Sequence, residues 1–506
     1  MDSNKRIARN TFLLTVRMVF VMIISLYTSR VILNTLGVVD YGIYNVVAGF
    51  VSMFSFLNSS LANGIQRFYN YEIGSKGNQS IGDVYVTSLQ IQIILAVLLV
   101  LVLETVGLWY VNNKMVIPED RFSVAVWVYH MAVLSLVFVV LQIPYSAVIL
   151  AHERMDYYAV VSIIDVVLKL GIAIILPFVS SDKLLYYGIL ISMISILDFC
   201  LYFVYAKHQF SALKYKHVFH LELMKSMLGF SGWNVFGTFA SMCKEQGLNM
   251  VLNLFYGPVV NAARGISYQV SSAVQSFVSS VGVSIRPQLI QSYASGDYSR
   301  SKSLMFSFSK IGFIILYVIS LPLMAEINYV LCLWLGDTVP NHTASFVRII
   351  FLINYINTLN GAVSAVIHAS GKMALYQMAG SIISIVVLPV SYVQLTNGAS
   401  PESVFYATLI ITAIGHCISL VIMHHVVSFP ILEYCSKVLY PILMIIIFSF
   451  WIPIAVKMIL PEGLLRLFIS IILSSVAIIL LTVSLGMDKK EKQILKNILN
   501  KYFKRS

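Results

Sequence analysis

Arginine and lysine side chains lie inside long apolar segments of this sequence, where a charge is costly unless it has a partner. Arg30 stands near the far end of the first such segment, in the stretch SLYTSRVILNTLG, and Arg264 and Arg348 stand inside later ones. A guanidinium group stays protonated in proteins, so in apolar surroundings it needs an anion or water. Its planar fork donates two parallel hydrogen bonds to a phosphate, while lysine supplies a point charge. The pattern favours a binding site for an anionic ligand.

Five cationic residues are our candidates for a substrate-binding cavity: Arg30, Arg264, Lys244, Lys169 and Arg348. Arg30 and Arg264 reach similar depths, roughly 6–10 Å below the outer surface at about 1.5 Å per residue, and fall in opposite halves of the chain. Lys244 lies near the middle of its segment, and we expect no ion pair with Glu245, because sequence neighbours point about 100° apart on a helix. The alternative for each arginine is that it anchors a helix end at the membrane surface, as we expect of Lys310 at the other surface.

Three carboxylates are candidates for binding a coupling ion or proton: Asp40, Asp165 and Glu245. Asp165 and Lys169 are four residues apart on one helical face, so a structural ion pair is an equal alternative to a role in the cavity. No spacing of Cys, His, Asp or Glu suits a metal, and the five cysteines are scattered without a Cys-x-x-Cys pair. We therefore expect no metal site and no cofactor.

Amide side chains also lie within the apolar segments, among them Asn45, Asn249, Asn354 and Gln275. Such groups would suit the hydroxyls of sugars. Asn, Gln and Ser also hydrogen-bond membrane helices to one another, and for any single residue we expect this structural role.

The composition places these residues in an integral membrane protein. Apolar residues make up 58% of the 506 residues, charged residues make up 11%, and the mean hydropathy is +0.84. Apolar windows of about 20 residues, long enough to cross a hydrocarbon core of about 30 Å as a helix, recur along nearly the whole chain. We predict an all-α polytopic fold with about fourteen transmembrane helices, at residues 12–34, 42–65, 84–108, 122–150, 158–179, 184–206, 226–256, 262–285, 304–326, 344–368, 374–396, 402–426, 437–457 and 463–485.

The basic residues predict the orientation, since Lys and Arg accumulate in cytoplasmic loops. They occur before the first predicted helix and after every second one, whereas the other connections hold five exceptions: Lys114, Arg121, Lys183, Lys457 and Arg466. Both termini are therefore predicted to be cytoplasmic. The net charge of +12 mostly reflects this bias, so it does not indicate binding to nucleic acid.

A weak internal repeat predicts how the helices are organised. LNTLG (33–37) is echoed by LNLFYG (252–257), and Arg67 and Gly77 keep the same separation as Arg286 and Gly296. We therefore predict two six-helix lobes related by a pseudo-two-fold axis along the membrane normal. The predicted parts are 1–206 (first lobe), 207–225 (basic cytoplasmic loop), 226–427 (second lobe), 428–485 (additional helix pair) and 486–506 (an amphipathic basic tail on the membrane lipids).

Several stretches resemble the polysaccharide flippases of the multidrug/oligosaccharidyl-lipid/polysaccharide exporter superfamily. They are NTFLLTVRMVFVMIISLYTSRVILNTLGVVDYGIYNVVAGF near the N-terminus, IRPQLIQSYASGD and ILAHERMDYYA. The resemblance implies two six-helix lobes around a central cavity. It implies movement of an undecaprenyl-pyrophosphate-linked oligosaccharide to the outer leaflet of a bacterial inner membrane, for O-antigen or other lipopolysaccharide assembly, with a polymerase and glycosyltransferases as partners.

Other functions stay open at this point. On the same fold, the substrate could be the peptidoglycan lipid precursor, a drug or a small solute; a cationic cavity argues against cationic drugs. A membrane polysaccharide polymerase or acyltransferase would need convergent acid and base groups or an activated nucleophile, usually on sizeable loops. The loops here are short, and His152, His416, His424 and His425 lie near predicted cytoplasmic ends without such partners. We therefore expect a transporter rather than an enzyme.

Overall fold

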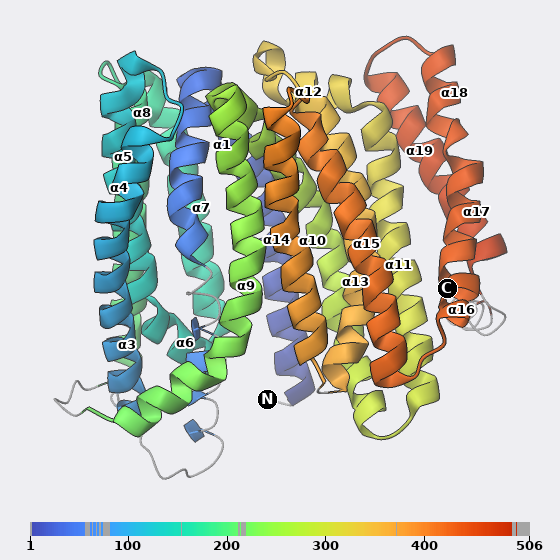
Figure 1. Ribbon diagram of the computed structural model, residues 1–506, viewed down its shortest axis with the longest axis horizontal. Coiled ribbons are helices and arrows are strands. Elements are labelled where there is room, and N and C mark those ends of the chain that lie inside the picture. Colours follow the sequence, from blue (N-terminus) through green and yellow to red (C-terminus); the bar gives the residue numbers. More distant parts are fainter. Residues whose placement is uncertain are drawn as a thin grey trace. The chain divides into compact units, whose positions relative to one another are not determined.

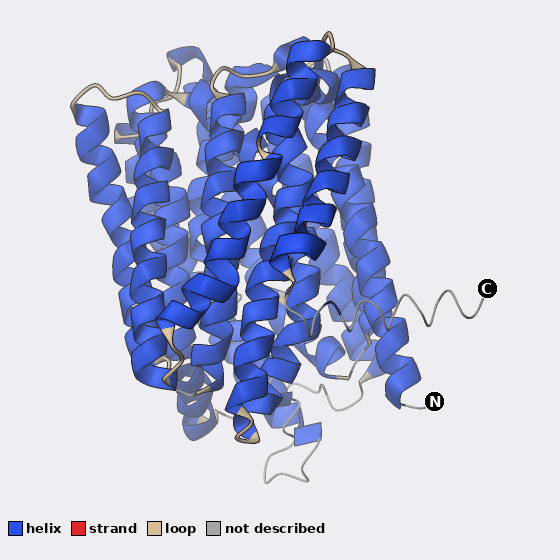
Figure 2. Ribbon diagram, turned by 90° about the vertical axis from the view of Figure 1, so that its right-hand side faces the viewer, coloured by secondary structure: helices blue, strands red, loops and turns tan. Residues whose placement is uncertain are grey.

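The computed structural model describes residues 3–55, 61, 62, 64–66, 68, 69, 72, 73, 81–152, 154–210, 213, 219–370, 372–487 and 492. Every regular element within these residues is a helix, and no strand is present among them (Figure 2). The predicted all-α fold is confirmed. Most of the predicted tail and part of the predicted 207–225 loop lie outside the described residues.

Two glycines in a left-handed backbone conformation each separate one helix from the next. α1 (Ser3–Ser52) consists of two helices joined at Gly37, with φ 78° and ψ 170°. α9 (Leu221–Tyr256) ends at Gly257, with φ 71° and ψ −171°, and α10 (Pro258–Ala294) follows. This region of φ and ψ is essentially restricted to glycine. The LNTLG and LNLFYG stretches therefore share a backbone geometry, while Arg67 and Gly77 lie outside the described residues.

The helices belong to two compact units. Unit 1 comprises residues 1–265, 337–342 and 384–401, and unit 2 comprises residues 266–336, 343–383 and 402–506. The division falls inside α10 and inside α14 (Ala374–Thr396), and α9 belongs to unit 1 although the sequence assigned it to the second lobe. The two lobes, their symmetry axis and their boundaries stay predictions.

Unit 1 is built around α1 and five further stretches of helix. They are α3 (Ile81–Val102) with α4 (Leu108–Asn113), α5 (Phe122–Leu141), α6 (Ile143–Ala151), α7 (Met155–Ile175) and α8 (Lys183–Gln209). α1 packs against α7 and α5, and α5 packs against α8 (Figure 1). Pro144 stands in the first turn of α6, where its missing N–H is tolerated, and α6 thus follows α5 almost directly. The buried hydroxyl groups of Tyr85 and Tyr145 lie 3.2 Å apart in the core.

Unit 2 is built around α11. Its helices after α10 are α11 (Tyr298–Ala325), α12 (Ile327–Leu335), α13 (Thr343–Ala369), the start of α14, α15 (Glu402–Val427), α16 (Ile431–Tyr434), α17 (Tyr440–Ser449), α18 (Trp451–Ile459) and α19 (Leu464–Leu481). α11 packs against α13 and α19, and α13 packs against α15 (Figure 1). Large apolar side chains such as Phe346, Phe351 and Leu316 are fully buried there, and close van der Waals packing between these membrane helices stabilises the unit.

The C-terminal helices are joined to α11 by hydrogen bonds at two positions along that helix. The hydroxyl groups of Tyr317 and Ser449 lie 3.1 Å apart, and Lys310 Nζ donates to the backbone oxygen of Gly486 at 3.2 Å. Lys310 is only 4% exposed, so the prediction that it extends to the membrane surface was wrong. A packed carbonyl oxygen beside the C-terminal end of α19 satisfies its ammonium group instead.

Eleven helical segments within the described residues are long and apolar enough to cross a membrane. The first runs from Arg17 to Ser55 and covers both sides of Gly37, and α9 and α10 are not among the eleven. The protein is therefore a multi-pass membrane protein, while the number fourteen stays a prediction.

Candidate functional site

The α9–α10 hairpin of unit 1 holds three of the predicted charged residues together. The break at Gly257 lets α10 fold back along α9, so Arg264 meets Glu245. Arg264 Nη2 donates to the backbone oxygen of Glu245 at 2.6 Å and lies 3.2 Å from its carboxylate oxygen Oε2. The Arg264 side chain is only 8% exposed, whereas that of Glu245 is 34% exposed. The arginine is thus a buried cation held by an accessible carboxylate.

Lys244 completes this group, which we call the α9–α10 charge cluster: Lys244, Glu245 and Arg264. Lys244 Nζ lies 3.6 Å from Glu245 Oε1, and the lysine side chain is 19% exposed. The expectation that these sequence neighbours would not pair was wrong, because the long flexible lysine stem spans the angle between adjacent positions. Two cations share one carboxylate, so the cluster carries one net positive charge.

Buried asparagines fix the helices that carry the cluster. Asn261 of α10 donates from Nδ2 to both Oδ1 and the backbone oxygen of Asn249 on α9, each at 2.7 Å. Asn249 donates in turn to the backbone oxygen of Asn45 on α1, at 3.1 Å. Asn249 and Asn261 are 3% and 0% exposed. For Asn249 the expected structural role is confirmed, since such bonds hold membrane helices together, whereas the Asn45 amide donates to the backbone oxygen of Tyr41 within α1 at 2.7 Å.

A very close backbone contact brings α10 against the second half of α1. A Cβ atom on Gly42 would lie 1.9 Å from the backbone oxygen of Pro258, so no other residue fits there without a shift. This contact sets the position of the first turns of α10, and with them that of Arg264 two turns later.

Asp165 and Lys169 form the predicted ion pair on α7. Lys169 Nζ lies 2.7 Å from Asp165 Oδ1 and donates to Oδ2 at 2.9 Å, with the side chains 40% and 27% exposed. Asp198 of α8 interacts with both of them. The pair is local and the carboxylate is engaged, so a role of either residue in a cavity or in ion coupling stays a prediction.

Asp40 belongs to a second charged group, with Arg121 and Asp182, which also explains why Arg121 is an exception to the basic-loop pattern. Arg121, just before α5, binds Asp40 through Nε at 2.8 Å, and its two terminal nitrogens each lie 2.5 Å from a carboxylate oxygen, one of Asp40 and one of Asp182. Asp182 also caps α8 by accepting from the backbone N–H of Leu185 at 3.1 Å. Burial raises the pKa of Asp182, but the bonds from Arg121 and Leu185 outweigh it and hold that pKa below its ordinary value. Arg121 breaks the basic-loop pattern because two acids neutralise it.

Arg30 and Arg348 are the remaining candidates. Arg30 is half-buried on α1 before Gly37. Arg348, on α13 in unit 2, donates from Nε to the backbone oxygen of Met324 at 3.1 Å. The substrate-binding roles of Arg30 and Arg348 stay predictions.

Sequence reasoning missed an ionisable pair inside the apolar segments, that of Glu104 and His130. His130 of α5 lies 3.0 Å from Glu104, which stands in a π-helical turn at Leu103–Gly107 between α3 and α4. The hydroxyl of Tyr129 donates to the backbone oxygen of Leu103 at 2.6 Å, which satisfies a carbonyl in that turn. A glutamate and a histidine inside apolar segments were the available signal.

A profile of the family described as "Polysaccharide biosynthesis protein" matches residues 7–293 of the chain. A comparison with curated protein sequences found no match.

Several solved structures are similar over most of the chain. A structure of the lipid II flippase MurJ in an inward closed conformation has a TM-score of 0.72 at 14% identity, covering 93% of this chain and 98% of that one. An outward-facing multidrug resistance MATE family transporter of the MOP superfamily has a TM-score of 0.55 at 11% identity, covering 85% and 96%. A MOP superfamily transporter from Pyrococcus furiosus, whose binding pocket is described as having reverse polarity, has a TM-score of 0.56 at 11% identity, covering 85% and 96%. At these identities the likeness establishes the fold alone.

Proposed function

The chain belongs to the polysaccharide biosynthesis protein family, and from this premise we propose that it is a flippase for lipid-linked oligosaccharide. Its substrate would be an oligosaccharide on undecaprenyl pyrophosphate, moved from the inner to the outer leaflet of a bacterial inner membrane for assembly of a surface polysaccharide such as O-antigen. Glycosyltransferases would act before it, and a membrane polymerase would act after it. In this proposal both termini are cytoplasmic.

The observation that carries the proposal is the net positive charge of the α9–α10 charge cluster. A pyrophosphate that leaves water needs fixed cations in place of its hydration shell. Arg264 and Lys244 supply them, and Glu245 neutralises only one of the two. The buried asparagines hold the cluster in place, so its positive charge is preorganised for an anion.

In this mechanism Glu245 serves as an internal counter-ion. Without substrate, its carboxylate satisfies Arg264 and Lys244; when the pyrophosphate arrives, it replaces Glu245 at the two cations. Alternating access then exposes the loaded site to the other leaflet. Protonation of Glu245, Asp165 or Asp40 is the proposed route by which an ion gradient could act on this exchange.

Transport of the peptidoglycan lipid precursor is the second candidate, because the lipid II flippase structure is similar over nearly the whole chain. Both substrates carry a pyrophosphate, so the same cluster would serve either. Export of cationic drugs fits the cluster poorly, since a second positive charge would be repelled. A polymerase or acyltransferase activity has no comparable support.

The test compares surface glycan per molecule of membrane-inserted protein. Arg264→Gln, and the double variant Arg30→Gln with Arg264→Gln, should export much less glycan than the parent, while Arg264→Lys should retain an intermediate level because it keeps the charge but loses the fork. Lys457→Gln is the matched control, because Lys457 is an exposed basic residue of α18. Normal export by the double variant would refute the proposal. A flux assay in vesicles with defined glycan-linked and peptidoglycan-type lipids would separate the two substrates.

A further inference from the structure

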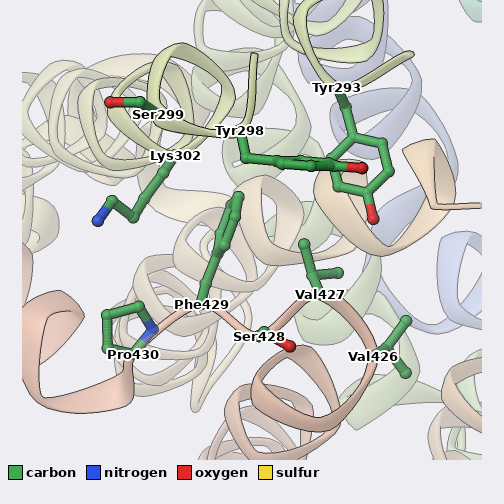
Figure 3. Close-up of a pocket in the computed structure, with 9 residues that line it drawn as sticks. All are labelled: Tyr293, Tyr298, Ser299, Lys302, Val426, Val427, Ser428, Phe429 and Pro430. Carbon is green, nitrogen blue, oxygen red and sulfur yellow. The ribbon is translucent and has the colours of Figure 1, made fainter. Parts of the chain in front are cut away.

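A pocket of about 580 Å³ lies at one end of unit 2, remote in sequence from the α9–α10 charge cluster. It is lined by the end of α10, the first turns of α11 and the connection from α15 to α16: Tyr293, Tyr298, Ser299, Lys302 and Val426 to Pro430 (Figure 3). Arg300 stands in the first turn of α11 among these residues, and Lys437 stands in the π-helical turn Cys435–Leu439 that follows α16. By the distribution of basic residues, this end is the predicted cytoplasmic one.

Three charged side chains meet beside the pocket: Lys302, Glu433 and Lys437. Glu433 accepts from Lys302 Nζ at 2.6 Å and from Lys437 Nζ at 2.8 Å, so two ammonium groups share one carboxylate. Lys302 lines the pocket, whereas Glu433 and Lys437 are not among its lining residues. The ammonium group of Lys302 is therefore the positive charge that a ligand in the pocket would meet.

Aromatic rings and hydroxyl groups form the rest of the wall. The rings of Tyr293 and Tyr298 pack edge to face with centroids 5.1 Å apart, and Figure 3 shows the Phe429 ring beside them. Ser299 and Ser428 add two hydroxyl groups. Tyrosines of this kind, apolar at one side and polar at the tip, are typical of the level where lipid headgroups lie.

The α15–α16 connection holds its shape at an energetic cost. Ser428 has φ 59°, which is unusual for a residue other than glycine. Its N–H donates to the backbone oxygen of His424 at 3.0 Å, and a ring nitrogen of His424 lies 3.0 Å from the backbone oxygen of Phe429. Strained backbone that its surroundings keep in place is concentrated at ligand sites. The pocket is thus preorganised.

We propose that this pocket binds the phosphate-bearing headgroup of an anionic phospholipid. The ammonium of Lys302 pairs with the phosphate, the hydroxyl groups of Tyr293, Tyr298 and Ser299 donate to its oxygens or to the glycerol, and the acyl chains leave toward the membrane. The volume suits a headgroup, and the site does not depend on what the flippase carries. Occupancy would tie α10, α11 and the α15–α16 connection together.

The test uses the full-length protein in detergent and reads lipid adducts by native mass spectrometry and the melting temperature. Phosphatidylglycerol should remain bound and raise the melting temperature, whereas phosphatidylcholine should do neither. Lys302→Gln should reduce phosphatidylglycerol binding by about tenfold, the order of one charge-assisted hydrogen bond. Lys372→Gln, which removes an exposed basic residue outside the pocket wall, is the matched control and should change binding less than twofold.

A charge-swap variant distinguishes an effect of the pocket itself from an effect of the overall charge or of a folding defect. The double variant Lys302→Glu with Glu433→Lys keeps an ion pair between the same positions and the same net charge, but it removes the ammonium from the wall. We expect it to fold and, without lipid, to melt slightly below the parent, because Lys437 loses its partner Glu433, and we expect it to lose the preference for phosphatidylglycerol. Retained preference in the swap would overturn the proposal, as would equal stabilisation by millimolar inorganic phosphate in the absence of lipid, which would mean a free-phosphate site.

Discussion

Arg466 at the start of α19 and Glu326 at the end of α11 form an ion pair that is nearly sealed from solvent. The side chains are 7% and 1% exposed, and Arg466 Nη2 lies 2.5 Å from Glu326 Oε2. A second carboxylate, that of Glu462, lies 3.5 Å from the same nitrogen but is 60% exposed. Pairing with these two carboxylates therefore explains why Arg466 is another exception to the basic-loop pattern. The pair joins the C-terminal helices to the C-terminal end of α11, beyond the contacts of Lys310 and Tyr317.

Removal of one partner of this pair should destabilise the protein more than removal of both. Arg466→Met leaves the buried carboxylate of Glu326 without its partner, and the free energy of unfolding should fall by about 3–5 kcal/mol. Glu326→Leu should cost less, because Glu462 stays beside Arg466. The double variant leaves two apolar side chains and should recover most of that loss. Melting temperatures of the purified variants, combined as a double-mutant cycle, check this; a double variant no more stable than the worse single one would contradict it.

The Arg121 group predicts a pH-dependent contribution to stability. The pKa of Asp182 is held below its ordinary value in the folded protein, so its carboxylate stabilises the fold above the ordinary aspartate pKa of about 4. That contribution is lost as the pH falls through the lowered folded-state pKa. Asp182→Asn should lower the melting temperature at pH 7, and its difference from the parent should shrink below about pH 4. A difference that stays constant from pH 7 to pH 3 would show that the charge is irrelevant.

The two helix-separating glycines should not tolerate a side chain. Gly37→Ala and Gly257→Ala force an L residue into a region of φ and ψ that costs about 1–3 kcal/mol. Gly380→Ala in α14 is the control, because a Cβ atom there meets nothing within 4 Å; alanine favours a helix over glycine, so this variant should be neutral or slightly stabilised. Melting temperature and the amount of membrane-inserted protein measure the three variants. Equal behaviour of all three would show that the two left-handed glycines are dispensable.

Features that depend on residues close together in the sequence could be predicted from it. The apolar segments, the break near Gly37 and the Asp165–Lys169 pair depend on residues within a few turns of one another, and all three are present in the structure. The Lys244–Glu245 pair is equally local, but it depends on how a flexible lysine stem bends, which helical spacing does not specify.

The spacing of residues along the sequence does not predict ion pairs between side chains that are far apart in the chain. Arg121 is joined to carboxylates on two other helices, and His130 meets Glu104 only because α5 packs beside the π-helical turn. Without these partners, Arg121 looked like an exception and Glu104 like an ordinary residue of an apolar segment. The sequence did identify Arg264 as unusual, but not that Glu245 holds it.

The counter-ion role of Glu245 gives the last prediction. If the pyrophosphate replaces Glu245 at Arg264 and Lys244, then removal of the carboxylate should help substrate bind, and removal of the lysine should hinder it. Glu245→Gln should therefore bind undecaprenyl pyrophosphate about tenfold more tightly yet export less glycan, because release also needs the counter-ion to return. Lys244→Gln should bind it about tenfold more weakly.

Asp156→Asn is the matched control for this pair of variants, because it also removes one carboxylate from unit 1 but lies in a separate exposed ion pair with Arg154. Its affinity for undecaprenyl pyrophosphate should stay within twofold of the parent. Affinity is measured on purified protein in detergent, with uncharged undecaprenol as the comparison ligand, and export is measured per inserted molecule. Opposite shifts for Glu245→Gln and Lys244→Gln are what a displaceable counter-ion requires. If both variants lose affinity, the carboxylate instead only holds Arg264 in position, and the exchange mechanism is wrong.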